Sequence, residues 1–69
     1  MERTPIISKN IKSYAYKELT LEIEFKQGRV YQYFNVPEST MQDFIKAESK
    51  GDFFKRNIIG KFMYKEVLP

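Results

Sequence analysis

Residues 19–37, LTLEIEFKQGRVYQYFNVP, decide the fold of this 69-residue chain. Apolar and polar side chains alternate over residues 19–26, and an alternation with a period of two is typical of a strand that is buried on one face. Gly28 follows, and then a second run rich in valine, tyrosine and phenylalanine, which favour strands. The stretch therefore predicts an antiparallel hairpin with strands at residues 19–26 and 29–35.

The length of the turn decides which face the tyrosines of the Tyr31-Gln32-Tyr33 motif occupy. A two-residue loop would turn both tyrosines outward, whereas a three-residue loop at residues 26–28 would place them on the apolar face. A slip of one residue moves every side chain to the other face. We favour the three-residue loop because only Gly28 then needs a positive φ, and because Gln32 then lies opposite Glu22 on the polar face.

The remaining segments complete an α+β domain. The run at residues 11–16, IKSYAY, predicts a first strand, and the turn that follows it is centred on Lys17 and Glu18. The sequence leaves open which face Tyr14 and Tyr16 occupy. We expect a three-stranded antiparallel sheet at residues 11–16, 19–26 and 29–35, and one domain over residues 1–69 whose first eight residues are loosely held.

After Pro37 the apolar period changes to that of a helix. Met41, Phe44 and Ile45 share one helical face, which predicts a helix over residues 38–47. Ser49 and Asp52 form a near capping box, which predicts a second helix over residues 50–58. Residues 61–67 are expected to be extended, either paired with a sheet edge or lying across the helices.

The composition excludes several kinds of chemistry. The chain has no cysteine and no histidine, so it has no thiol and no side chain that titrates near neutral pH. A zinc site built only from carboxylates is not expected. We therefore expect no catalytic residue, no metal and no cofactor. No apolar run approaches the roughly 20 residues that cross a bilayer, and the first ten residues lack the apolar core of a signal peptide. A cytoplasmic protein without a membrane partner is the expectation.

The positive charge is unevenly distributed. The net charge is +3, and residues 46–69 hold all of the excess, with six basic and three acidic side chains. Lysine and arginine contacts to phosphates supply much of the affinity of nucleic-acid binding proteins. The candidate phosphate contacts are Lys50, Lys55, Arg56, Lys61 and Lys65. The alternative is an ordinary solvated surface with a few weak ion pairs.

Other side chains have two interpretations. Tyr31 and Tyr33 either stack on unpaired bases or form the rim of the core with their hydroxyls in contact with water. Glu22 and Glu24 lie two apart on one strand face, and we expect them in water and not as an acid–base pair. Val30 and Phe34 lie on the same outer face and make it a candidate docking surface for a protein.

The motifs together resemble one known family. IKSYAY, the Tyr31-x-Tyr33 motif followed by Val36-Pro37, and the run Ser49-x-Gly51-x-Phe53-Phe54 resemble the KTSC domain, over roughly residues 7–67. That family is named for its occurrence at the C-terminus of some lysyl-tRNA synthetases, and it also occurs as short single-domain bacterial proteins. The turn after Tyr16 is shorter here than is usual for the family.

The resemblance implies a small binding module of bacterial or phage origin. RNA binding has been suggested for the family from its association with a synthetase, and the family offers no catalytic residues to carry over. We therefore expect a non-catalytic module that binds RNA through its basic C-terminal half. The alternative is a module that binds a protein partner through the open sheet face.

Overall fold

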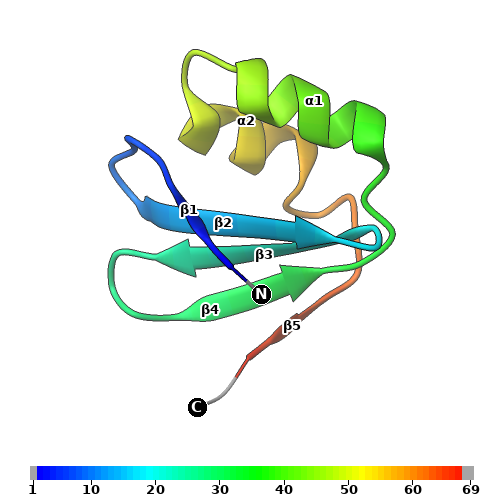
Figure 1. Ribbon diagram of the computed structural model, residues 1–69, viewed down its shortest axis with the longest axis horizontal. Helices are drawn as coiled ribbons and strands as arrows, with labels where there is room; N and C mark the ends of the chain where they lie inside the picture. The colour runs from blue at the N-terminus through cyan, green and yellow to red at the C-terminus, as the bar shows by residue number, and fades with distance from the viewer. Residues whose placement is uncertain (1, 68–69) are drawn as a thin grey trace.

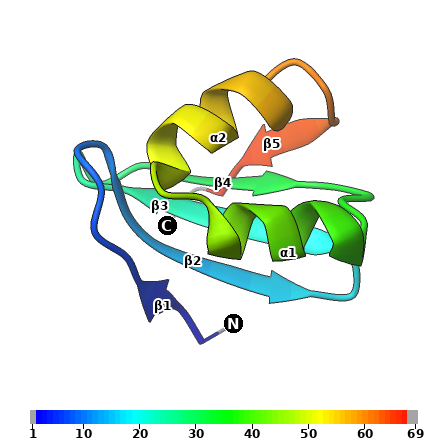
Figure 2. The ribbon, with the colours of Figure 1, turned by 90° about the horizontal axis from the view of Figure 1, so that it is seen from above.

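Two helices cover one face of a five-stranded antiparallel sheet in the computed structural model, which describes residues 2–67 (Figures 1 and 2). The order of the strands in the sheet is their order in the chain. The elements are β1 (Thr4–Pro5), β2 (Ile11–Lys17), β3 (Thr20–Phe25), β4 (Val30–Tyr33), α1 (Glu38–Lys46), α2 (Lys50–Asn57) and β5 (Tyr64–Glu66). Both helices lie between β4 and β5 in the chain, and β5 returns to pair with β4.

The predicted α+β class is confirmed, but the three-stranded sheet is wrong because two short edge strands extend it. At the N-terminal end, β1 pairs with β2, with Thr4 opposite Tyr14. β5 resolves the alternatives left open for residues 61–67, because it pairs with the edge of β4. Both strands are exposed and too short to show an alternating pattern.

The three-residue turn of the central hairpin is confirmed. Ile23 lies opposite Tyr31 and Leu21 opposite Tyr33. The Phe25 amide donates to the Arg29 carbonyl at 2.8 Å, which closes the loop around Gly28, whose φ is +100°. Both tyrosines therefore share the face that the helices cover, as this register requires.

The turn before β3 differs from its prediction. Glu18 and Leu19 both have positive φ, +50° and +65°, between the paired residues Lys17 and Thr20. Positive φ at both central residues is the geometry of a two-residue type I′ turn. Leu19 is thus a turn residue with 46% of its surface exposed, and not the first apolar residue of the strand. The alternation of apolar and polar residues continues into the turn, so the sequence pattern did not show that the strand begins at Thr20.

The helices begin where the sequence places them. Pro37 precedes α1, and its carbonyl accepts from the amides of Thr40 and Met41. Ser49 caps α2, since its Oγ accepts from the Asp52 amide at 3.3 Å. The helices end one residue earlier than predicted, and Ile45 is exposed, so the apolar stripe of α1 is narrower than its spacing suggested.

The core lies between the helices and the sheet. Its buried residues come from both layers: Ile11, Leu21, Ile23, Tyr33, Val36, Met41, Phe44, Phe54 and Ile58. The ring of Phe54 on α2 packs edge-to-face against the rings of Phe25 and Tyr33, with centroid distances of 5.8 and 5.3 Å. The ring of Phe44 on α1 packs in the same way against Tyr14. These edge-to-face pairs are the preferred geometry of aromatic rings. They fix α1 over β2, and α2 over β3 and β4.

Candidate nucleic-acid interface

A hollow of about 640 Å³ lies between the loop from β1 to β2, the β3–β4 turn and the first half of α2. We call it the basic groove. Its lining includes four lysines that come from three separate segments: Lys9, Lys26, Lys50 and Lys55. Two carboxylates, Glu48 and Asp52, also line it, which leaves a local charge of +2. The fold thus gathers lysines that are up to 46 positions apart in the sequence.

Close approach of the loop to α2 builds this groove. A Cβ atom on Gly51 would lie only 3.2 Å from the Ser8 Oγ, so glycine is what lets the loop lie against the helix without displacing that hydroxyl. The same Oγ accepts from the amides of Asn10 and Ile11 at 3.4 and 3.3 Å, which holds the loop in shape. Ser49, two residues before Gly51, caps the start of α2. The Ser49-x-Gly51 motif therefore has a structural role beside the groove.

The basic residues predicted from the sequence divide among different surfaces. Lys50 and Lys55 line the basic groove, whereas Arg56 and Lys61 are exposed outside it. Lys65 is paired with Gln32, so it lies on the sheet face opposite the helices. Lys50 Nζ also donates to the Ala47 carbonyl at 3.2 Å.

Two groove lysines were missed in the sequence. Lys9 and Lys26 lie in the half of the chain whose charges balance, so counting charge along the sequence gave no reason to select them. The only available signal was that Lys26 belongs to the hairpin turn and Lys9 to a loop. Both are places where a side chain can reach a neighbouring element.

A second hollow, of about 340 Å³, lies on the other side of the β3–β4 turn. We call it the aromatic groove. It is lined by Phe25, Gln27, Arg29, Tyr31, Tyr33, Ile59, Gly60 and Tyr64. The centroid of the Tyr64 ring lies 5.7 Å from that of Tyr31 and 5.5 Å from that of Tyr33. The Tyr31-x-Tyr33 motif and β5 together form this aromatic wall.

The two tyrosines of the motif have different surroundings. Tyr33 is buried, and burial, followed by the proximity of Tyr64 and Tyr31, raises its pKa to about 12. Tyr31 is half-buried, and Tyr64 is 59% exposed. Tyr33 is therefore a core residue, as the inward register predicts, whereas Tyr31 and Tyr64 offer ring surface to a ligand. Tyr64 was not selected from the sequence, because nothing there places β5 beside β4.

Arg29 supplies the positive charge of the aromatic groove. The proximity of Tyr31, followed by that of the Glu66 carboxylate, raises the pKa of its guanidinium. Arg29 was not among the predicted basic residues, since it too lies in the half of the chain that carries no net charge. The aromatic groove thus combines exposed rings with one cation.

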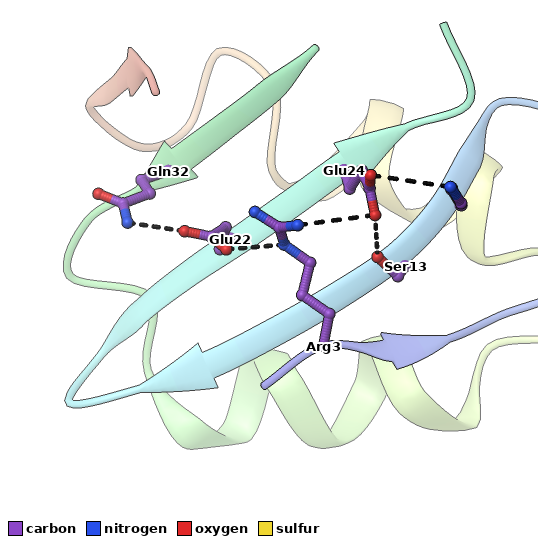
Figure 3. Close-up of polar contacts among 6 residues, drawn as sticks. Arg3, Ser13, Glu22, Glu24 and Gln32 are labelled. Carbon is purple, nitrogen blue, oxygen red and sulfur yellow. Dashed lines mark hydrogen bonds and ion pairs between the residues drawn. The ribbon is translucent and has the colours of Figure 1, made fainter. Parts of the chain in front are cut away.

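The opposite sheet face holds a polar network and not a solvated pair of carboxylates (Figure 3). Glu22 is only 5% exposed, so the expectation that it lies in water is wrong. Arg3 Nε lies 2.8 Å from Glu22 Oε2, and Gln32 Nε2 donates to Glu22 Oε1 at 2.9 Å. Ser13 Oγ donates to Glu24 Oε1 at 2.7 Å. The covering residue is Arg3, which lies just before β1, a strand that the sequence did not predict.

This network favours an ionised Glu22. Burial on its own would raise the pKa of Glu22, but the hydrogen bonds from Gln32 and Arg3 and the charge of Arg3 outweigh it and lower that pKa. An ionised carboxylate whose oxygens both accept hydrogen bonds is a poor proton acceptor. The arrangement is that of a structural ion pair.

Apolar side chains also occur in β4 and in the residues that flank β4 and β5. Val30 is opposite Glu24 and therefore on the same sheet face as that carboxylate, and both Val30 and Phe34 are half-buried. The Phe34 amide donates to the carbonyl of Met63, whose side chain is 78% exposed. The predicted placement of Val30 on the outer face is confirmed, whereas Phe34 lies just beyond the paired residues of β4.

No helix among residues 2–67 is long and apolar enough to cross a membrane. No three acidic side chains in that range gather closely enough to hold a metal ion.

The fold and its two grooves define a small α+β domain with a basic and an aromatic hollow on either side of one hairpin turn. Residues 7–62 match the model of the KTSC domain, and the chain belongs to that family. A crystal structure of a KTSC domain protein from Yersinia pestis is 43% identical, covers 97% of both chains and superposes with a TM-score of 0.90.

Two relatives show the settings in which similar sequences occur. A lysine–tRNA ligase from Nostoc punctiforme is 47% identical over 55 residues, which is 80% of this chain but 10% of that protein. A protein of Stutzerimonas stutzeri described as uncharacterized is 33% identical over 58 residues, 81% of this chain and 82% of that one. The chain therefore spans about a tenth of the ligase that it matches and most of the shorter relative.

Proposed function

We propose that this protein is a non-catalytic module that binds RNA in the cytoplasm through the basic groove. The observation that carries the proposal is the convergence of Lys9, Lys26, Lys50 and Lys55 on one hollow. Lysine ammonium groups contact phosphates as mobile point charges, and such contacts bind a nucleic-acid backbone without reading its sequence. The similarity to part of a lysine–tRNA ligase supports RNA as the nucleic acid.

The groove charge sets the scale of the expected binding. Each phosphate contact to a single strand contributes about 0.7 to the slope of log affinity against log salt, so four lysine contacts give a slope of up to about 2.8. Glu48 and Asp52 lie in the same hollow and oppose part of this attraction. We therefore expect weak, strongly salt-dependent binding.

The test is a titration of the labelled protein with a single-stranded RNA octamer at low salt, followed residue by residue by NMR. Shifts are expected around Lys9, Lys26, Gly51 and Lys55, and they should diminish as salt is added. The absence of any shift up to high micromolar RNA would overturn the proposal.

A matched pair of variants separates the groove from overall charge. The double variant Lys9→Gln/Lys55→Gln removes two groove lysines and should lower the salt slope by about 1.4. The control, Lys17→Gln/Lys65→Gln, makes the same change in net charge at an exposed strand end and on the opposite sheet face. Equal losses in both variants would mean that the groove has no special role.

A second function is favoured by apolar side chains on and beside the outer sheet face. Val30 lies opposite Glu24 on that face, and the Phe34 amide donates to the carbonyl of Met63, whose side chain is exposed. Exposed apolar surface is typical of docking sites. In this alternative the domain docks on a protein, as an accessory to a larger enzyme. Val30→Asp and Phe34→Asp variants that stay folded should lose such a partner in a pull-down. Retention of every partner by both folded variants would rule out this surface.

A further inference from the structure

The aromatic groove presents exposed rings and a cation side by side. Tyr64 exposes 59% of its surface although it contacts both Tyr31 and Tyr33. Arg29 lines the same hollow as these rings. The domain therefore keeps part of the Tyr64 ring surface in water.

We infer that the aromatic groove takes one unpaired nucleobase of an RNA strand, stacked on Tyr64, with Arg29 bound to an adjacent phosphate. The inference rests on the proposed RNA binding and adds to it a second contact site and a preference for single strands. Every base has a flat π-face, so stacking on tyrosine accepts any base.

The ring geometry determines where the base can lie. The centroids of Tyr31 and Tyr64 are 5.7 Å apart, within the range of rings that already contact each other, so a base cannot enter between them. The accessible surface is the solvent side of Tyr64 together with the exposed part of Tyr31. The base therefore stacks on the outside of the cluster.

The charge of the groove selects an anionic ligand over a cationic one. Aromatic clusters also bind quaternary ammonium groups, but Arg29 would repel a cation placed against the same rings. Glu66 lies near Arg29 and is the acidic group that a phosphate must outcompete. A guanidinium can hold two phosphate oxygens at once, which gives it an advantage over lysine at such a position.

The position of the groove connects it to the basic groove. Lys26, at the start of the β3–β4 turn, lines the basic groove, whereas Gln27 and Arg29 line the aromatic groove. A strand of RNA that crosses this turn can therefore contact both. Gln27 lines the aromatic groove, and its amide offers donors and an acceptor for the edge of a base bound there.

The decisive experiment compares two ligands of equal charge, an RNA octamer and an abasic octamer of the same backbone. Stacking contributes about 1–3 kcal/mol per base, so the abasic strand should bind about 5- to 150-fold more weakly. Tyr64→Leu should weaken binding of the octamer at least about fivefold and leave binding of the abasic strand unchanged. Phe34→Leu is the matched control, because it removes a ring that does not line the aromatic groove.

Equal binding of both octamers, together with no effect of Tyr64→Leu, would overturn this inference. The proposed function would still stand if Lys9→Gln/Lys55→Gln weakened both ligands equally. A titration with a nucleoside monophosphate tests the groove separately. Shifts at Tyr31 and Tyr64 that Arg29→Gln diminishes would support the nucleotide site even if the octamer did not bind. The absence of shifts there would overturn it.

Discussion

Arg3, which lies outside the predicted strands and helices, helps to keep the Glu22 carboxylate ionised. It reaches across β2 from the edge of the sheet and pairs with Glu22 on β3 (Figure 3). The Glu22 side chain is 7% exposed and that of Arg3 34%. Loss of the arginine would leave a buried carboxylate without its cation, and that cost exceeds the net contribution of the intact pair.

We expect Arg3→Ala to lower the free energy of unfolding by about 1–2 kcal/mol at pH 7. This value is at the low end of the cost of leaving a buried charge unpaired, because the Arg3 side chain is partly solvated. Chemical denaturation measures the change. The control is Lys12→Ala, since Lys12 lies 4.0 Å from Glu24 and its side chain is 66% exposed. That change should cost less than about 0.5 kcal/mol. Equal effects of the two variants would contradict a special role for Arg3.

The same pair predicts a pH dependence. The pKa of Glu22 is lowered below its ordinary 4.5, so the folded state favours the ionised carboxylate. Its contribution to stability is therefore present above pH 4.5 and is lost as the pH falls through the lowered pKa. The stability difference between wild type and Arg3→Ala should accordingly shrink as the pH is lowered from 4.5. A difference that is constant down to pH 2.5 or so would show that Arg3 acts through packing alone.

At the scale of elements, the residues of the turn between β2 and β3 are poorly suited to its backbone conformation. Type I′ turns favour Asn-Gly, because both central residues have positive φ. Here Glu18 and Leu19 occupy those positions. A left-handed backbone costs an ordinary L-residue about 1–2 kcal/mol, and asparagine tolerates it better. The flanking strands hold the turn closed through the pairs Lys17–Thr20 and Tyr16–Leu21.

We therefore expect Glu18→Asn to stabilise the protein by about 0.5–1 kcal/mol, and Glu18→Val, with its branched Cβ, to destabilise it by a similar amount. Thermal unfolding of the three proteins measures both changes. Glu18→Gln removes the same charge without changing the turn preference, so it should have little effect. If Glu18→Gln stabilised the fold as much as Glu18→Asn, charge and not backbone conformation would be the cause.

At the scale of the molecule, the sheet divides into a protected centre and two exposed edges (Figures 1 and 2). β3 lies in the middle of the sheet, and its Leu21 and Ile23 are fully buried under the helices. β1 and β5 are short and exposed along their whole length. The aromatic groove depends on β5, because that strand carries Tyr64.

Amide hydrogen exchange should reflect this division. We expect the amides of β3 to exchange only through global unfolding, and those of β1 and β5 to exchange at least about tenfold faster through local opening. Binding of the RNA octamer should slow exchange in β5 if Tyr64 contacts a base. Exchange in β5 as slow as in β3 without RNA would contradict the edge-strand description.

The sequence predicts the segments whose cause is local. The alternation over residues 19–26 and the single glycine in the second turn set the register of the central hairpin, and hence the inward direction of Tyr33. Proline 37 and the Ser49 cap locate the starts of both helices. These features depend on backbone preferences and on side chains close in the chain, so residues far away do not change them.

The candidate site was predicted only in part, because its residues come from distant segments. Lys50 and Lys55 were selected, but Lys9 and Lys26 join them only when the loop packs on Gly51. Tyr64 meets Tyr31 only because β5 returns to the edge of β4. No local pattern specifies either contact, since each depends on the packing of the whole chain.

By itself, then, the sequence determined an α+β domain with a hairpin whose tyrosines face the helices, and its motifs identified the KTSC family. The tertiary structure alone decided that the sheet has five strands, that Arg3 covers Glu22, and that two grooves flank the β3–β4 turn. The physical reason is the range of the interactions. Periodicity and turn preferences act over a few residues, whereas edge strands and grooves form only when elements far apart in the chain pack together.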